Sequence, residues 1–79
     1  MAALQLHVHI QQELLFLQAL AAEKNLALNF QVELIPEEGI EVIIDIAGQG
    51  IEIFDQVTIT SDGEWNEFSQ DIQFAMDSA

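Results

Sequence analysis

The chain has 79 residues, of which 14 are acidic and one is a lysine, and its formal net charge at pH 7 is −13. Solubility of a small domain is served by a net charge of about 2 to 8 in magnitude, so this charge exceeds that need. Direct binding to nucleic acid or to an anionic membrane surface is therefore disfavoured, and a basic protein is the natural partner.

Length and composition predict one small domain over residues 1–79. Apolar residues make up 51 % of the chain, which is enough to build a core. The chain has no cysteine, which excludes disulfides and cysteine-ligated metal and fits a reducing compartment. No basic region precedes an apolar segment at the N-terminus, and no apolar run approaches the ~20 residues of a membrane span. We therefore expect a cytoplasmic location.

The first predicted element is a helix over residues 11–25. Glu13 lies in its first turn, Lys24 lies in its last turn, and Asn25 can end it in the left-handed conformation. The preceding apolar residues alternate as in a short strand, but no turn residue separates the two stretches, so we favour an earlier start of the helix. The apolar run at 14–17 is wider than one helix stripe and indicates a homodimer contact as one use of this helix.

Three strands are expected next, in an antiparallel meander. Residues 26–35 alternate between apolar and polar, and PEEG at 36–39 is a turn. In the second strand, at 40–47, Ile40, Val42, Ile44 and Ile46 face inward, and Glu41, Ile43 and Asp45 face outward. Gly48 and Gln49 suit a two-residue type II′ turn, because glycine accepts the positive φ of its first central position. The third strand runs from 51 to about 60. Asp55 falls on its apolar face, so either a bulge lies at 54–56 or Asp55 sits at an exposed rim.

The last element is an amphipathic helix. Ser61 and Glu64 have the spacing of a capping box at its start. Apolar residues then recur on one face: Trp65, Phe68, Ile72, Ala75 and Met76. The expected fold class is therefore α+β, with an N-terminal helix, a three-stranded antiparallel β-meander and a C-terminal helix (α-β-β-β-α).

The outer face of the sheet is the first candidate partner-binding surface. The predicted turn places Asp45 opposite Glu52 and Ile43 opposite Phe54, with Glu41 opposite Gln56. A plausible register of the first hairpin places Glu33 opposite Glu41. The result is an apolar pair with a charged rim, as in many protein-binding patches: Ile43 and Phe54 ringed by Glu33, Glu41, Asp45 and Glu52. Alternatively, the C-terminal helix covers this pair, which would place helices on both faces of the sheet.

The C-terminal helix is the second candidate surface. Glu64, Glu67 and Asp71 are spaced by three and four residues, so they form one row at roughly 5 to 6 Å intervals. Such a row resembles a strip of phosphates in sign and coarse spacing. A solvated helix face is the plainer interpretation. No lysine or arginine lies near these carboxylates in sequence, which favours the first interpretation.

We expect no metal, no cofactor and no catalytic residues. His7 and His9 would share one side only in a strand, and Glu13 is the one further ligand near them in sequence. No nucleophile and base are placed together, and no phosphate-binding glycine motif occurs.

These patterns favour a non-enzymatic acidic inhibitor that binds a basic nucleic-acid-binding protein or nuclease complex by mimicking nucleic acid. Anti-restriction and anti-CRISPR proteins of phages are a functional analogy only, because no motif connects them to this chain. One alternative is an immunity-like or antitoxin-like protein that neutralises a basic toxin. Another is a homo-oligomeric structural or assembly subunit. A basic partner would relieve the repulsion among crowded carboxylates in the first two classes.

Overall fold

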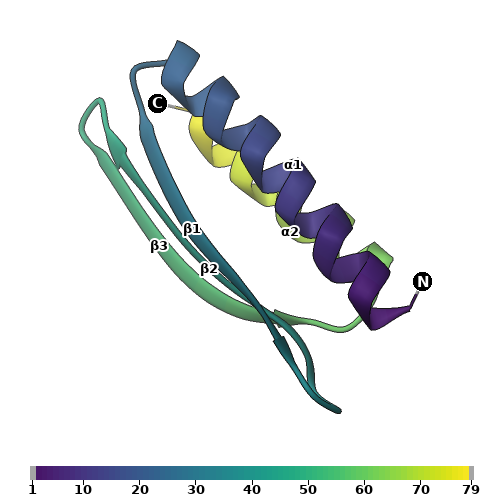
Figure 1. Ribbon diagram of the computed structural model, residues 1–79. Helices are drawn as coiled ribbons and strands as arrows, with labels where there is room; N and C mark the ends of the chain where they lie inside the picture. The colour runs from purple at the N-terminus through teal and green to yellow at the C-terminus, as the bar shows by residue number, and fades with distance from the viewer. Residues whose placement is uncertain (1, 79) are drawn as a thin grey trace.

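The computed structural model describes residues 2–78 and has the expected α-β-β-β-α order. The elements are α1 (Ala3–Glu23), β1 (Ala27–Ile35), β2 (Gly39–Gly48), β3 (Ile51–Ile59) and α2 (Asp62–Asp77). The strands form one antiparallel sheet in the order β1-β2-β3, which confirms the α+β class. Figure 1 shows α1 and α2 side by side on one face of this sheet, running in the same direction. Among residues 2–78, no helix has both the length and the apolar character to cross a membrane.

The core lies between the sheet and the two helices. The central strand β2 contributes four side chains with 0 % exposure: Ile40, Val42, Ile44 and Ile46. α1 is helical through residues 4–10, so the favoured helical interpretation of that stretch is confirmed. Its buried residues recur at helix spacing: Leu6, Ile10, Leu14, Leu17 and Ala21. Asn25 follows the helix with φ 61°, the expected left-handed conformation.

Polar side chains of α1 cover part of the free edge of β1. Gln18 Nε2 donates to the carbonyl oxygen of Leu28 at 2.8 Å, and His7 Nε2 lies 3.3 Å from the carbonyl oxygen of Val32. Carbonyl groups engaged in this way are not available to a strand added at that edge. α1 therefore blocks two positions of the β1 edge.

The turn between β2 and β3 differs from the prediction. Its central residues are Gln49 and Gly50, with φ 50° and 79°, and Gly48 pairs with Ile51. Two positive φ values are typical of a type I′ turn, so the predicted type II′ turn at Gly48–Gln49 is wrong. Gly48 meets a different need, because a Cβ there would lie 2.9 Å from the carbonyl oxygen of Asn25. The turn lies one residue later than predicted, so each β2 residue faces a β3 residue two positions further along.

Asp55 lies at an exposed rim, and no bulge is present. The pairing of β2 with β3 continues without interruption through Asp55, which faces Ile44. Its Oδ1 accepts a hydrogen bond from the backbone N–H of Gln56 at 2.9 Å. A charge on the inner face of an edge strand discourages pairing with a strand of another chain. Asp55 thus protects the β3 edge as α1 protects the β1 edge.

Candidate protein-binding site

The outer face of the sheet is free of the helices. Both helices lie on the opposite face (Figure 1), and Phe54 is 66 % exposed. The alternative in which α2 covers Ile43 and Phe54 is therefore wrong. α2 buries Trp65 and Met76 against the core side instead. The acidic residues of the outer face are presented to solvent beside an exposed aromatic ring.

The later turn changes the pairs across β2 and β3. Asp45 faces Phe54, and Glu52 faces Ala47, so the predicted opposition of Asp45 and Glu52 is wrong. A shift of two residues keeps every side chain on its predicted face, because strand side chains alternate with a period of two. The two carboxylates therefore share the outer face as diagonal neighbours.

Two further predicted pairs are also wrong for the same reason. Ile43 faces Gln56 and lies diagonal to Phe54, and Glu41 faces Thr58. The Gln56 side chain still reaches Glu41, and its Nε2 donates to Glu41 Oε2 at 3.3 Å. The apolar pair at the centre of the predicted patch is therefore looser than expected.

Glu33 and Glu41 form the directly opposed acidic pair of the sheet, as predicted. Like charges that face each other across strands destabilise a sheet by roughly 0.2 to 1 kcal/mol. The hydrogen bond from Gln56 offsets part of this cost at Glu41. The outer face therefore carries its most concentrated negative charge at this pair and more diffuse charge elsewhere.

Carboxylates of α2 continue the acidic surface past the β3 edge. Asp55 and Asp71 line one hollow of about 220 Å³ between β3 and α2. Asp71 also lines a neighbouring hollow of about 260 Å³ with Glu64 and Glu67. We call the whole surface the acidic band: Glu33, Glu41, Asp45, Glu52, Asp55, Glu64, Glu67 and Asp71.

The floor of the two hollows is apolar. Ile53 and Val57 of β3 and Phe68 of α2 line them and are half-buried. Lysine and arginine side chains combine an apolar stem with a charged head, so this lining matches both parts of such a residue.

Asp55 is not among the predicted site residues, because the alternation along the third strand places it on the core face. A charged residue on an otherwise apolar strand face was the sequence signal that could have identified Asp55.

The chain's one lysine lies away from the acidic band. Lys24 Nζ is 3.0 Å from Asp77 Oδ1, where the ends of α1 and α2 meet. The sequence has no arginine or second lysine that could neutralise the band. No cationic side chain therefore relieves the repulsion within the band when the protein is alone, and solvent and salt provide most of the screening.

Glu64 has a structural role besides its charge. Its Oε1 accepts hydrogen bonds from the backbone N–H and the hydroxyl of Thr60, each at 2.6 Å. Ser61 Oγ accepts from the backbone N–H of Glu64 at 3.2 Å, which confirms Ser61 as the N-cap. The Glu64 carboxylate bonds to Thr60 where a standard capping box would engage the N-cap residue. Within the row on α2, Glu67 and Asp71 remain the carboxylates more available to a partner.

The cap predicts a pH-dependent stability. The Thr60 hydroxyl, followed by the Thr60 backbone N–H, holds the pKa of Glu64 below its usual value of 4.5. A carboxylate whose folded-state pKa is lowered stabilises the fold above its unfolded pKa, and this contribution is lost as pH falls through the folded pKa. Glu64→Gln should therefore lower the melting temperature at pH 7, and its difference from the wild type should shrink in strong acid.

Thermal melts of the wild type and Glu64→Gln, from pH 7 down to strong acid, measure the difference in melting temperature. Glu67→Gln is the matched control, because Glu67 lies on the same exposed side of α2 and its loss removes no cap. Equal melting temperatures for the wild type and Glu64→Gln at pH 7 would contradict the assignment.

The two histidines face different partners. His7 contacts the β1 edge, whereas His9 Nε2 lies 3.2 Å from Glu13 Oε1 and 3.6 Å from Asp62 Oδ1. Trp65 Nε1 donates to the same Glu13 oxygen at 2.8 Å, so this cluster joins α1 to the start of α2. Within residues 2–78, no group of three or more histidine, aspartate or glutamate side chains could hold a metal ion.

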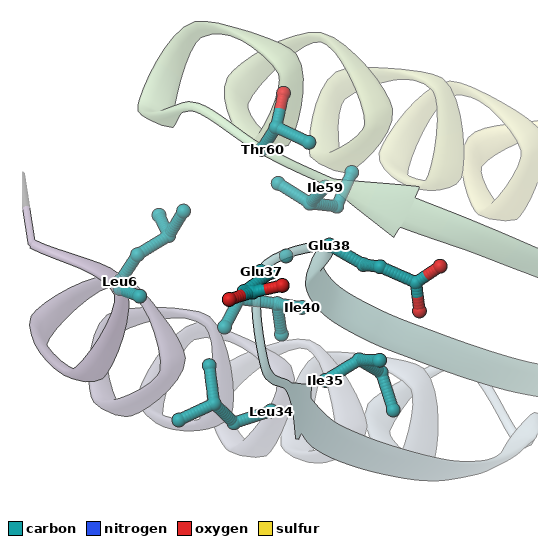
Figure 2. Close-up of a pocket in the computed structure, with 10 residues that line it drawn as sticks. Leu6, Leu34, Ile35, Glu37, Glu38, Ile40, Ile59 and Thr60 are labelled. Atoms are coloured by element: carbon teal, nitrogen blue, oxygen red, sulfur yellow. The ribbon is translucent and has the colours of Figure 1, made fainter.

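A cavity of about 310 Å³ lies at the end of the sheet near the β1–β2 turn. Figure 2 shows apolar side chains from α1 and all three strands around it: Leu6, Leu34, Ile35, Ile40 and Ile59. Its ionisable lining residues are Glu37 and Glu38 in the turn, and both are exposed. The Thr60 hydroxyl at its border donates to Glu64.

No protein-family model, no curated protein and no solved structure matches this chain. The fold and the placement of charge are the observations from which a function can be inferred.

Proposed function

We propose that this protein is a non-enzymatic acidic inhibitor that occupies the nucleic-acid-binding surface of a basic protein or nuclease complex. The observation that carries the proposal is the acidic band, which extends over the outer face of the sheet and continues on α2 beyond the β3 edge. Its carboxylates come from all three strands and α2, and the one lysine of the chain is paired with Asp77 at the end of the helices.

Electrostatic energy supports a binding role for this crowding. Each pair of like charges that face each other across strands destabilises the fold by roughly 0.2 to 1 kcal/mol, and salt reduces this further. A domain of this size has a total stability of only about 5 kcal/mol. A basic surface that meets the band recovers the repulsion energy and accelerates encounter by electrostatic steering.

The distribution of charge along the chain favours a localised function over general solubility. Only Glu13 and Glu23 of the 14 acidic residues precede residue 33. Glu13 is engaged by Trp65, and the solvent side of α1 is largely uncharged. Charge that served solubility alone would have no reason to avoid this helix.

On α2, Glu67 and Asp71 lie one helical turn apart, about 6 Å, and can replace successive phosphates in a basic groove.

The absence of cysteine fits a reducing compartment, and we place this binding in a cytoplasm. Phage anti-restriction and anti-CRISPR proteins remain a functional analogy for the proposed action.

The test is capture of the partner from the native host, followed by competition. We expect the captured protein to bind nucleic acid, duplex DNA or RNA to displace this chain from it, and affinity to fall steeply as salt rises. A captured basic toxin that nucleic acid does not displace would support the neutralising alternative and contradict mimicry. Binding that is insensitive to salt would contradict any role for the acidic band.

A further inference from the structure

The solvent side of α1 carries an apolar stripe without charge. We define the uncharged stripe by six exposed residues: Leu4, Val8, Gln11, Leu15, Ala19 and Ala22. Leu4, Val8 and Leu15 are 66 %, 45 % and 54 % exposed. Steps of three and four residues place the stripe along one line of the helix, opposite the buried face. Such a line is the pattern by which two helices pack together.

We propose that two copies of this protein pair through the uncharged stripe, α1 against α1 and antiparallel, about a two-fold axis near Gln11 and Gln12. Each copy has a net charge of −13, so two copies repel least when they meet on a face without carboxylates. The uncharged stripe is such a face over nearly the whole length of α1. The inference does not depend on the proposed function, because the acidic band lies elsewhere on the molecule.

The stripe is complementary to itself in this arrangement. An axis near Gln11 and Gln12 brings Leu4 of one copy towards the small Ala19 of the other, and Val8 towards Leu15. A two-fold contact repeats each of these pairings. Leu4 thereby meets a small side chain, and Val8 and Leu15 pack against each other. The glutamine side chains near the axis can exchange hydrogen bonds between copies.

The strand edges disfavour the other common way of pairing two copies. α1 engages the carbonyl groups of Leu28 and Val32 at the β1 edge. The β3 edge carries Asp55, whose carboxylate engages the Gln56 N–H. An added strand would have to displace these groups, and at β3 it would bring further carboxylates together.

The size of the stripe sets the strength of the expected dimer. α1 has 21 residues, which corresponds to a length of about 31 Å. One helix face of this length provides less than the roughly 800 Å² per partner of a standard interface. We therefore expect a dimer that forms at micromolar concentrations and dissociates on dilution.

Sedimentation equilibrium across the micromolar range, at low and high salt, tests the proposal. We expect the mass to rise with concentration from 8.8 kDa towards twice that value. Added salt should strengthen the dimer, because it screens the repulsion between the two acidic chains. Salt should instead weaken the partner binding proposed above. The two proposals are therefore contradicted by different results.

Leu15→Glu should weaken the dimer by about 100-fold or more, because it places a carboxylate without a partner in each half of the contact. Phe74→Glu is the control with the same charge change, since Phe74 is 76 % exposed on α2 and outside the stripe. This control should dimerise like the wild type. A wild-type mass that stays at 8.8 kDa at every concentration and salt would overturn the proposal. Equal dimerisation of both variants would overturn the α1 contact.

Cross-linking tests the two-fold axis directly, because the chain has no cysteine of its own. Gln11→Cys should form a disulfide-linked dimer under mild oxidation, since Gln11 belongs to the stripe and the axis brings its two copies close together. Gln70→Cys, exposed on α2, should cross-link much more slowly. Equal rates for the two variants would overturn the proposed axis.

Discussion

Replacement of both Asp55 and Asp71 by lysine is expected to weaken partner binding by about 100-fold or more. The two carboxylates line one hollow, where the sheet and α2 contribute to the same surface. The double change turns attraction into repulsion at the centre of the acidic band. A loss of about 3 kcal/mol corresponds to two orders of magnitude in affinity. Both residues are exposed, and we expect the variant to melt at the same temperature as the wild type or higher.

The matched control is Glu23→Lys with Glu38→Lys. This pair makes the same change in net charge, but Glu23 ends α1 and Glu38 lies in the β1–β2 turn, outside the acidic band. Titration calorimetry with the captured partner should show that the control loses less than about tenfold in affinity, because distant charges are screened beyond about 8 Å. Equal losses for both double variants would show that net charge alone matters, and would remove the β3 and α2 hollow from the site.

Trp65→Ala is expected to remove most of the free energy of unfolding. Trp65 is 0 % exposed, and its Nε1 donates to Glu13, so it joins α1 to α2 by packing and by a hydrogen bond. Truncation of a buried tryptophan costs about 3 to 5 kcal/mol, which is close to the whole stability of a small domain. Urea titration followed by far-UV circular dichroism measures the loss.

Phe74→Ala on the same helix is the control, because the Phe74 side chain is 76 % exposed. We expect it to change stability by no more than about 0.5 kcal/mol. Trp65→Phe should fall between the two, since it keeps an aromatic ring but loses the donor to Glu13. If Trp65→Ala were as stable as Phe74→Ala, Trp65 would not be the link between the helices.

Predictions that rest on local periodicity are confirmed. The strict alternation over residues 26–35 leads to β1, with Leu28 buried and Gln31 exposed. The helical spacing of Trp65, Ile72 and Met76 leads to α2, in which all three are buried. Such patterns arise from the geometry of a single element, so they can be read without knowing the rest of the fold.

The register of the second hairpin was predicted wrongly because a glycine can serve more than one purpose. Gly48 was assigned to the turn, but it allows close approach to the Asn25 carbonyl at the end of α1. That contact joins segments more than twenty residues apart, and no local pattern reports it. The pairs of Asp45 and Glu52 changed with the register, although their face did not.

The sequence by itself determined the order of the elements, the apolar face of each one and the excess of negative charge, because these depend on residue type and local spacing. Only the tertiary structure decided that both helices cover the same face of the sheet and leave the other exposed. It also brought Asp55 to Asp71 across the gap between β3 and α2 and turned an uncharged side of α1 outward. These arrangements follow from how the elements pack against one another, and packing joins residues whose separation along the chain carries no periodic signal.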